Sequence, residues 1–369
     1  MSNFSENFTS CTMEQAERLT VRNALLNQTT MMLGGYGWGK TSVGINLKNN
    51  PLLNAQYPIE HIVHFVPSEC DLTDNKGALD TIDVNGVKLT SFCPPQEYYK
   101  IVELAKQGKR SIIICDEVTD ADTIMQGIQR RIANEGVVGN LDLKVEYQGK
   151  IIRPIVVLLG NRPEDNSGYQ DVPNALFDRC NVIFIKPDAE TTANWMAENG
   201  CHPCPLAWVR SNPKVVNEGQ NPDHIVSMSG RSLERVSDQE KMGNIPADLE
   251  LPLFEGIVGT ELAESYVAFR RIYEGLIDRN KIYADPLGTE LPSEERPDIA
   301  YTLVTSLGYF MDKDNATATV KYVRRMKKTY ALLCIKDATS RNPKLMNNAE
   351  VSNFCMDNLD VFTNLGKGE

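Results

Sequence analysis

The stretch GGYGWGKT at residues 34–41 matches the phosphate-binding pattern G-x-x-x-x-G-K-[ST]. It follows the short apolar run 31–33 and precedes a segment, 41–48, whose residues suit a helix. A strand before the glycines and a helix after them is the context that such a loop requires. The stretch therefore predicts an α/β domain with a phosphate-binding loop (P-loop), although a glycine-rich turn can match the pattern by chance.

Each residue type in this loop has a chemical role. Glycines let successive backbone N–H groups point inward at phosphate oxygens. Lys40 is expected to place its positive charge on the β- and γ-phosphates, and the Thr41 hydroxyl is expected to ligate Mg²⁺. The helix that starts near Lys40 adds the positive end of its dipole. We expect nucleotide contacts from Gly34, Gly35, Tyr36, Gly37, Trp38, Gly39, Lys40, Thr41 and Ser42.

Length and charge limit the remaining possibilities. The chain has 369 residues and a net charge of −11, which allows two or three domains. The acidic balance argues against an overall nucleic-acid footprint but leaves a local basic pore open.

No apolar run approaches the roughly 18 residues of a membrane span, and the first residues lack the features of a signal peptide. Nine dispersed cysteines suggest free thiols in a reducing compartment, so we expect a cytoplasmic protein without membrane partners.

Two short clusters have ordinary explanations that we favour. The sequence CHPC at 201–204 suggests a metal or redox site, but no second Cys/His pair at zinc-finger spacing follows it. We therefore expect packing or surface thiols there. The basic run 321–328 could touch phosphate groups, yet such a run is more often the solvated face of a helix.

Alternating strands and helices define the first half of the chain. Short apolar runs predict buried parallel strands, because strands covered on both faces are apolar throughout. The predicted strands are 29–34, 61–66, 111–116, 154–160 and 181–186, and the predicted helices are 13–26, 41–48, 96–107 and 119–134. Two further stretches, 80–92 and 142–153, alternate around Asn85-Gly86 and Gln148-Gly149 and predict inserted β-hairpins.

Beyond residue 187 the pattern becomes helical. The predicted helices are 189–199, 231–241, 254–278, 298–312, 315–335 and 350–363. We expect three domains: an α/β nucleotide-binding domain at 1–187, a helical lid at 188–285 and a helical C-terminal extension at 286–369. The predicted fold class is α/β, with a parallel five-stranded P-loop core and two β-hairpin insertions.

A second acidic motif supports nucleotide hydrolysis. Residues 112–117 read IIICDE, an apolar strand followed by two carboxylates. Such a strand delivers Asp116 to the magnesium beside Thr41. Glu117 then lies where a carboxylate can orient and polarise the attacking water. Alone, the motif would be an ordinary acidic turn, but the P-loop before it favours the functional interpretation.

Three polar residues follow the later strands. Asn161 ends the strand 154–160 and can reach the γ-phosphate and the water, although Asn also favours turns. Arg179 precedes the last strand, and a guanidinium there could stabilise charge on a neighbouring subunit's transferring phosphoryl group. An ion-paired surface arginine is the alternative. Arg231 begins a predicted helix and could sense the γ-phosphate, or it is simply a helix-start arginine.

These residues together resemble an AAA+ ATPase. The two hairpins lie where the MoxR-like, dynein-related branch of that family has insertions, and the similarity is greatest to bacteriophage-encoded members. Residues 160–179 resemble the branch's sensor-to-finger segment, and residues 195–203 resemble the start of its lid. The sequence departs from the family at Tyr36, where Pro or Ser is common, and at Gly230, where the lid motif usually has Pro.

The resemblance implies a ring, commonly a hexamer, with ATP and Mg²⁺ at each interface. One subunit would supply Lys40, Thr41, Asp116, Glu117 and Asn161, and the next would supply Arg179. Chaperone-like remodelling of a partner, often a von Willebrand A-domain protein, is also implied, with the hairpin 80–92 at the pore or top surface. Two other functions stay open: a nucleic-acid motor or restriction-type NTPase, and a scaffold that binds ATP with little turnover. The absence of a guanine-reading Asn-Lys-x-Asp favours ATP over GTP.

Overall fold

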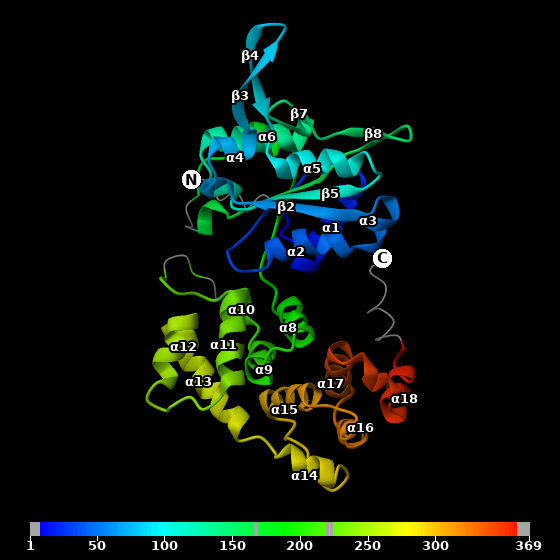
Figure 1. Cartoon of the computed structure of the whole chain (residues 1–369). Helices are drawn as coiled ribbons and strands as arrows, with labels where there is room; N and C mark the ends of the chain where they lie inside the picture. The colour runs from blue at the N-terminus through cyan, green and yellow to red at the C-terminus, as the bar shows by residue number, and fades with distance from the viewer. Residues whose placement is uncertain (1–7, 166–168, 219–220, 222–223, 360–369) are drawn as a thin grey trace. The chain divides into compact units, whose positions relative to one another are not determined.

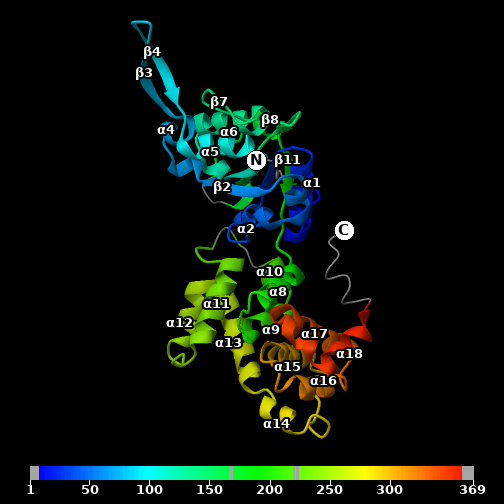
Figure 2. The same cartoon turned by 45° about the vertical axis from the view of Figure 1, so that its right-hand side comes forward.

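The computed structural model describes residues 8–165, 169–218, 221 and 224–359. The chain divides into two compact units, Met1–Pro187 and Asp188–Glu369, which are described separately. Figures 1 and 2 show the helices and strands of each unit. Within the described residues, no helix has the length and apolar character of a membrane span.

A parallel five-stranded sheet forms the centre of the first unit, in the order β11-β1-β10-β5-β2. The strands are β1 (Thr30–Leu33), β2 (Ile59–Phe65), β5 (Arg110–Cys115), β10 (Ile155–Gly160) and β11 (Asn181–Phe184). All residues of β1, β5 and β10 are buried, as strands covered on both faces should be. All five predicted strands are confirmed, and with them the predicted α/β fold class with a parallel five-stranded core.

Helices cover both faces of this sheet (Figure 1). The α-helices are α1 (Met13–Leu25), α2 (Lys40–Asn46), α3 (Pro51–Gln56), α4 (Leu72–Lys76), α5 (Gln96–Ala105), α6 (Thr123–Glu135) and α7 (Asn174–Phe177). The 3₁₀ turns are η2 (Leu47–Asn49), η3 (Pro67–Glu69), η4 (Val118–Asp120) and η5 (Pro163–Asp165). Alternate strand residues divide between two cores: Ile112 packs with α1, α2 and α3, whereas Ile113 packs with α5 and α6. This division follows from the two-residue repeat of a strand.

Both predicted hairpins are present. In the first, β3 (Ala78–Val84) pairs with β4 (Val87–Cys93) through Asn85 and Gly86, whose φ angles of 56° and 80° suit a type I′ turn. This hairpin extends away from the rest of its unit (Figure 2). In the second, β8 (Val145–Tyr147) pairs with β9 (Lys150–Ile152). The prediction began this hairpin too early, because Asp142 belongs to an additional pair, β6 (Val137–Val138) with β7 (Leu141–Asp142).

The second unit is entirely helical in its described part. Its elements are α8 (Ala189–Glu198), α9 (Pro203–Ser211), α10 (Lys214–Asn217), α11 (Gly230–Met242), α12 (Glu250–Val258), α13 (Thr260–Glu274), α14 (Arg279–Ala284), α15 (Pro297–Tyr309), α16 (Ala316–Val323), α17 (Lys328–Arg341), η6 (Pro343–Asn347) and α18 (Ala349–Met356). The predicted segment 360–363 lies outside the described residues.

Two predicted long helices are wrong, because each is two shorter ones. The segment 254–278 breaks at Gly259, whose φ of 85° no continuous helix contains. Any side chain at this position would also begin 2.8 Å from the Val226 carbonyl oxygen. The segment 315–335 breaks before Lys328, because Lys327 has the extended ψ of 139°. An apolar repeat of 3.6 residues does not reveal such breaks when both pieces bury the same face.

A buried ion pair joins helices from the predicted lid and the predicted extension. Arg210 of α9 donates to both carboxylate oxygens of Asp337 in α17, and both side chains are 7% exposed. Arg210 also donates to Thr305 Oγ1 at 3.1 Å. The helices of residues 188–285 and 286–369 therefore share a polar contact within one unit.

We predict that Asp337→Ala lowers the free energy of unfolding by about 3–5 kcal/mol, because it leaves the Arg210 guanidinium buried without its counter-charge. Urea unfolding followed by tryptophan fluorescence measures this, since Trp195 and Trp208 lie in the same unit. The double variant Arg210→Met with Asp337→Leu is the matched control and should recover most of the loss. Equal loss in both variants would contradict the electrostatic explanation.

Candidate functional site

The predicted site residues gather at the carboxyl ends of three neighbouring strands. β1 leads into the P-loop, β5 ends before Asp116, and β10 ends before Asn161. Because β1 pairs with β10, and β10 with β5, in parallel register, these ends meet at one edge of the sheet. Ligands of open α/β sheets bind at this edge.

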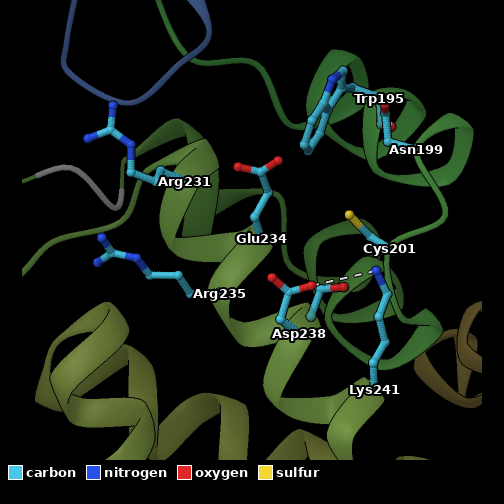
Figure 3. A pocket seen from close by; sticks show the side chains of 9 residues that line it. Trp195, Asn199, Cys201, Arg231, Glu234, Arg235, Asp238 and Lys241 are labelled. Atoms are coloured by element: carbon cyan, nitrogen blue, oxygen red, sulfur yellow. Dashed lines mark hydrogen bonds and ion pairs between the residues drawn. The ribbon is translucent and has the colours of Figure 1, made fainter.

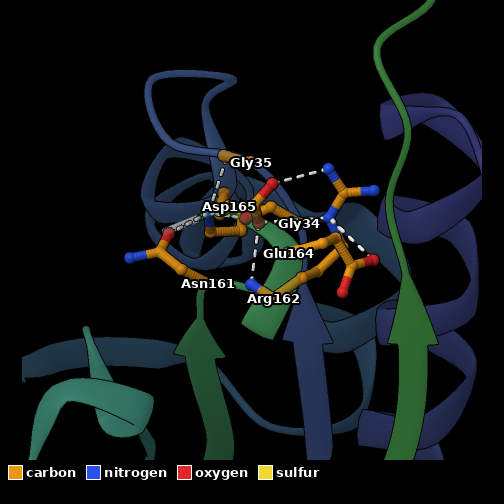
Figure 4. Close-up of polar contacts among 7 residues, drawn as sticks. Gly34, Gly35, Asn161, Arg162, Glu164 and Asp165 are labelled. Atoms are coloured by element: carbon orange, nitrogen blue, oxygen red, sulfur yellow. Dashed lines mark hydrogen bonds and ion pairs between the residues drawn. The ribbon is translucent and has the colours of Figure 1, made fainter. Parts of the chain in front are cut away.

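Lys40 lies inside the P-loop with its ammonium group enclosed by oxygens. Its Nζ donates to the carbonyl oxygens of Gly34 at 2.6 Å and Gly35 at 2.8 Å, and to Asn161 Oδ1 at 3.2 Å (Figure 4). Burial lowers the pKa of Lys40 to about 8, against the opposing charges of Asp165 and Asp116. Gly39, at the start of α2, has a φ of 87°, which only glycine adopts readily.

Thr41 and Asp116 contact each other directly. The Thr41 hydroxyl donates to Asp116 Oδ2 at 2.6 Å, and His64 Nε2 lies 3.5 Å from the same oxygen. A hydroxyl and a carboxylate at the mouth of the P-loop are hard oxygen ligands of the kind that Mg²⁺ prefers. The residues present therefore fit the predicted magnesium site. The nearness of His64 was not predicted, because nothing in the sequence connects the end of β2 with Asp116.

Glu117 lies at the bend that follows β5. Its backbone is left-handed, with a φ of 53°, and its N–H bonds Asp116 Oδ1 at 3.0 Å. Non-glycine residues rarely adopt this conformation, and they do so most often at functional sites. Burial raises the pKa of the Glu117 carboxyl, and the charges of Asp120 and Asp116 raise it further. A carboxylate with a raised pKa is a stronger proton acceptor than an ordinary one.

An ion-pair cluster that the sequence analysis missed follows Asn161. Arg162 Nη2 donates to Asp165 Oδ1 at 2.6 Å and its Nε donates to Oδ2 at 3.1 Å. Glu164 Oε1 lies 3.8 Å from the same guanidinium (Figure 4). Both carboxylates lie in the short turn η5 and the arginine directly precedes it, which explains how they meet. No known motif covers this turn, so only its charge alternation could have signalled it.

Arg179 makes its contact elsewhere in the first unit, and Arg231 lies in the second unit. Arg179 lies between α7 and β11, where its Nη1 donates to the Ala175 carbonyl oxygen. Arg231, near the start of α11, belongs to the helical unit and lines a hollow of about 260 Å³ there (Figure 3). The other lining residues are Trp195, Asn199, Cys201, Glu234, Arg235, Ser237, Asp238 and Lys241. The roles predicted for the two arginines remain predictions.

The CHPC cluster holds buried thiols. Cys201 and Cys204 are at most 4% exposed, and burial raises the pKa of both. Neither is a reactive thiolate at neutral pH, because a thiol with a raised pKa stays protonated. Among the described residues, no group of three His, Cys, Asp or Glu side chains could hold a metal ion. The packing interpretation accounts for both cysteines.

Comparisons with known proteins identify similar structures but no sequence family. No family profile and no curated protein sequence matches the chain. A candidate ATPase from Cytophaga hutchinsonii is 14% identical with a TM-score of 0.30, over 92% of this chain and 78% of that one. NtrX from Brucella abortus, solved with ADP, is 13% identical with a TM-score of 0.36, over 97% and 70%.

A third similar structure is a full-length MCM homolog from Methanopyrus kandleri, 13% identical with a TM-score of 0.26. That match covers 46% of this chain and spans 33% of the MCM homolog. These similarities are too low to support a functional argument. The class of protein follows instead from the sheet and the loop after β1, which define a parallel α/β protein with a P-loop sequence.

We predict that ATP affinity falls as the pH rises above about 8, by about tenfold between pH 8 and 9.5. Above its pKa, Lys40 in the free protein must take up a proton to meet a phosphate, and each pKa unit corresponds to tenfold in affinity. Titration with a fluorescent ATP analogue measures this. Lys40→Arg keeps its charge throughout and should bind with a flat profile. A flat wild-type profile would show that the Lys40 charge is not used.

Proposed function

We propose that the protein is an AAA+ ATPase that binds Mg-ATP and hydrolyses it to ADP and phosphate. This proposal rests on one observation. At the carboxyl ends of neighbouring strands, the side chains of Lys40 and Asn161 contact each other, as do those of Thr41 and Asp116, and Glu117 follows Asp116 in the chain. To hold phosphates, the P-loop needs only its backbone N–H groups and the ammonium group of Lys40. The additional carboxylate at Glu117 favours hydrolysis over simple binding.

The chain's own groups can be assigned to successive steps. Lys40 would exchange its contacts with Gly34 and Gly35 for the β- and γ-phosphates. Asn161 would keep its amide near the γ-phosphate and orient the attacking water. Glu117 would accept a proton from that water as the water oxygen bonds to the γ-phosphorus and the bond from that phosphorus to the bridging oxygen of ADP breaks. The raised pKa of Glu117 suits this role. Bound Mg²⁺, held by Thr41 and Asp116, would neutralise phosphate charge.

Assembly into a ring, commonly a hexamer, is the next part of the proposal. Arg179 lies two residues before β11, which is an edge strand of the sheet, and could therefore face a neighbouring copy of the chain. There it would stabilise charge on the neighbour's transferring phosphoryl group as an arginine finger. Arg231 would sense the γ-phosphate from the lid of its own subunit. Support for these roles comes from the sequence resemblance and from the edge position of β11.

The energy of hydrolysis would be used to remodel a partner protein, in the manner of a chaperone. The β3–β4 hairpin supports this role because one face near its tip is apolar and exposed. The side chains on that face are Ile82, Val84, Val87 and Leu89. We also propose that the protein is of the MoxR-like branch and related to bacteriophage members, with a von Willebrand A-domain protein as the candidate partner. The positions of the two hairpins support the branch.

A nucleic-acid motor or restriction-type NTPase is less well supported. In the basic run 321–328, Arg324 pairs with Asp357 at 3.1 Å and Lys327 pairs with Glu294 at 3.2 Å. Arg325 donates to the carbonyl oxygens of Pro286 and Thr289 at 2.8 Å. These cations hold the helical unit together and would have to be released to bind phosphate groups. Stimulation of turnover by DNA would favour the motor.

The test of the proposal is Glu117→Gln. We expect this variant to bind ATP with unchanged affinity, because the charge lost is not a phosphate contact. Its kcat should fall on the order of 10²-fold, as expected for loss of a general base. Steady-state phosphate release with Mg²⁺ gives kcat, and a fluorescent ATP analogue gives affinity. Glu135→Gln, an exposed carboxylate on α6, is the control and should match wild type.

Two results would separate the proposal from its rivals. Wild-type turnover that Glu117→Gln leaves intact would contradict the role of Glu117. Tight ATP binding with no turnover in the wild type would support the nucleotide-gated scaffold instead.

A further inference from the structure

A buried threonine connects the residues assigned to hydrolysis. Thr119 is fully buried, two positions after Glu117 in the turn η4. Its Oγ1 accepts a hydrogen bond from the backbone N–H of Asn161 at 3.0 Å and donates one to Asp120 Oδ1 at 3.1 Å. One hydroxyl therefore joins the segment after β5 to the segment after β10.

The connection continues to the P-loop. Asn161, whose backbone Thr119 fixes, offers its side-chain oxygen to Lys40 Nζ at 3.2 Å. The Thr119 carbonyl oxygen also accepts from the Gln170 N–H at 2.6 Å. Thr119 thus contacts the start of one loop, the far end of that loop and its own turn. The bonds to the Asn161 N–H and to Asp120 need a hydroxyl, because a hydroxyl accepts and donates at once.

The methyl group of Thr119 lies close to the end of β10 at Gly160. A side chain at Gly160 would place its Cβ 2.5 Å from Thr119 Cγ2 and 3.1 Å from Oγ1. The glycine at the end of β10 therefore allows Thr119 to approach the strand closely. The hydroxyl and the methyl can be removed one at a time, by valine and by serine, which separates hydrogen bonding from packing.

We propose that Thr119 is a positioning residue that holds Asn161 and Glu117 in a fixed relation, so that both act on the same water. The proposal rests on the ATPase function proposed above. Because its side chain is fully buried, Thr119 would not itself touch nucleotide or the attacking water. It acts by fixing the Asn161 backbone on one side and the turn that begins at Glu117 on the other. Binding of ATP needs neither contact, so its loss should affect turnover rather than affinity.

The experiment compares Thr119→Val with Thr119→Ser in the full-length protein, using kcat, KM and the affinity for a fluorescent ATP analogue. We expect Thr119→Val to lower kcat about tenfold, with KM and affinity within about twofold of wild type, because the buried Asn161 N–H loses its acceptor. Thr119→Ser keeps the hydroxyl and should keep kcat within about threefold. Thr20→Val is the matched control, since the Thr20 hydroxyl is equally buried but bonds only within α1 and to Met32.

Each other outcome decides against the proposal or is resolved by a further variant. If Thr119→Ser loses more activity than Thr119→Val, or if both match wild type, Thr119 serves packing alone and the proposal is overturned. If Thr119→Val does not fold by circular dichroism, Asp120→Ala and Asp120→Asn replace it, since both remove the charge but only Asn keeps an oxygen that accepts from the same hydroxyl. A lower kcat for Asp120→Ala than for Asp120→Asn at constant KM then supports the proposal, and equal kcat values overturn it. Absence of wild-type turnover would instead overturn the ATPase function.

Discussion

The parallel pairing of β1 with a strand on each side is the constraint on which the site depends. Residues Thr30–Leu33 pair with β10 on one side and with β11 on the other side. The first pairing brings the P-loop beside Asn161, and the second places the segment containing Arg179 at the edge of the sheet. Because β10 in turn pairs with β5, Asp116 lies with the P-loop and Asn161 at the carboxyl ends of the strands. A strand of four buried residues thus positions groups that are 121 residues apart in the sequence, Lys40 and Asn161.

The charges gathered at this end of the sheet suit the phosphate site proposed above. A buried ammonium group costs free energy unless its hydrogens are bonded, and three oxygens bond the hydrogens of Lys40. Asp116, Glu117, Asp120 and Asp165 surround it with negative charge. The raised pKa of Glu117 and the lowered pKa of Lys40 have the same main cause, which is loss of solvation of the charged form. Such paired shifts are typical of sites that move protons.

The strands of this fold were predictable from the sequence, whereas several of the helices were not. Buried strands were predictable because parallel strands covered on both faces are apolar throughout. The helices α3, α4 and α7 were missed because they are four to six residues long and show no repeat. The break at Gly259 was missed because both flanking helices bury the same kind of face. Long-range packing, rather than local preference, decides such points.

Some residues at the site could likewise be predicted from the sequence, and others could not. Lys40, Thr41, Asp116 and Asn161 were predictable, because the chemistry of phosphate requires those residue types after those strands. His64, Thr119 and the Arg162–Asp165 pair were not, because their roles arise from contacts between segments that no motif records. The role of Arg231 stays a prediction from its place at the start of a helix, and Arg231 belongs to the other unit of the chain.

The measurement that tests the central claim most directly is ATP turnover when two inactive variants are mixed, Lys40→Ala and Arg179→Ala. Each alone should be nearly inactive, the first for lack of phosphate binding and the second for lack of the finger. If the site is completed between subunits, a mixed ring contains some interfaces with an intact Lys40 and an intact Arg179, and turnover reappears. Turnover equal to the sum of the two separate variants at every ratio and concentration would contradict the shared site.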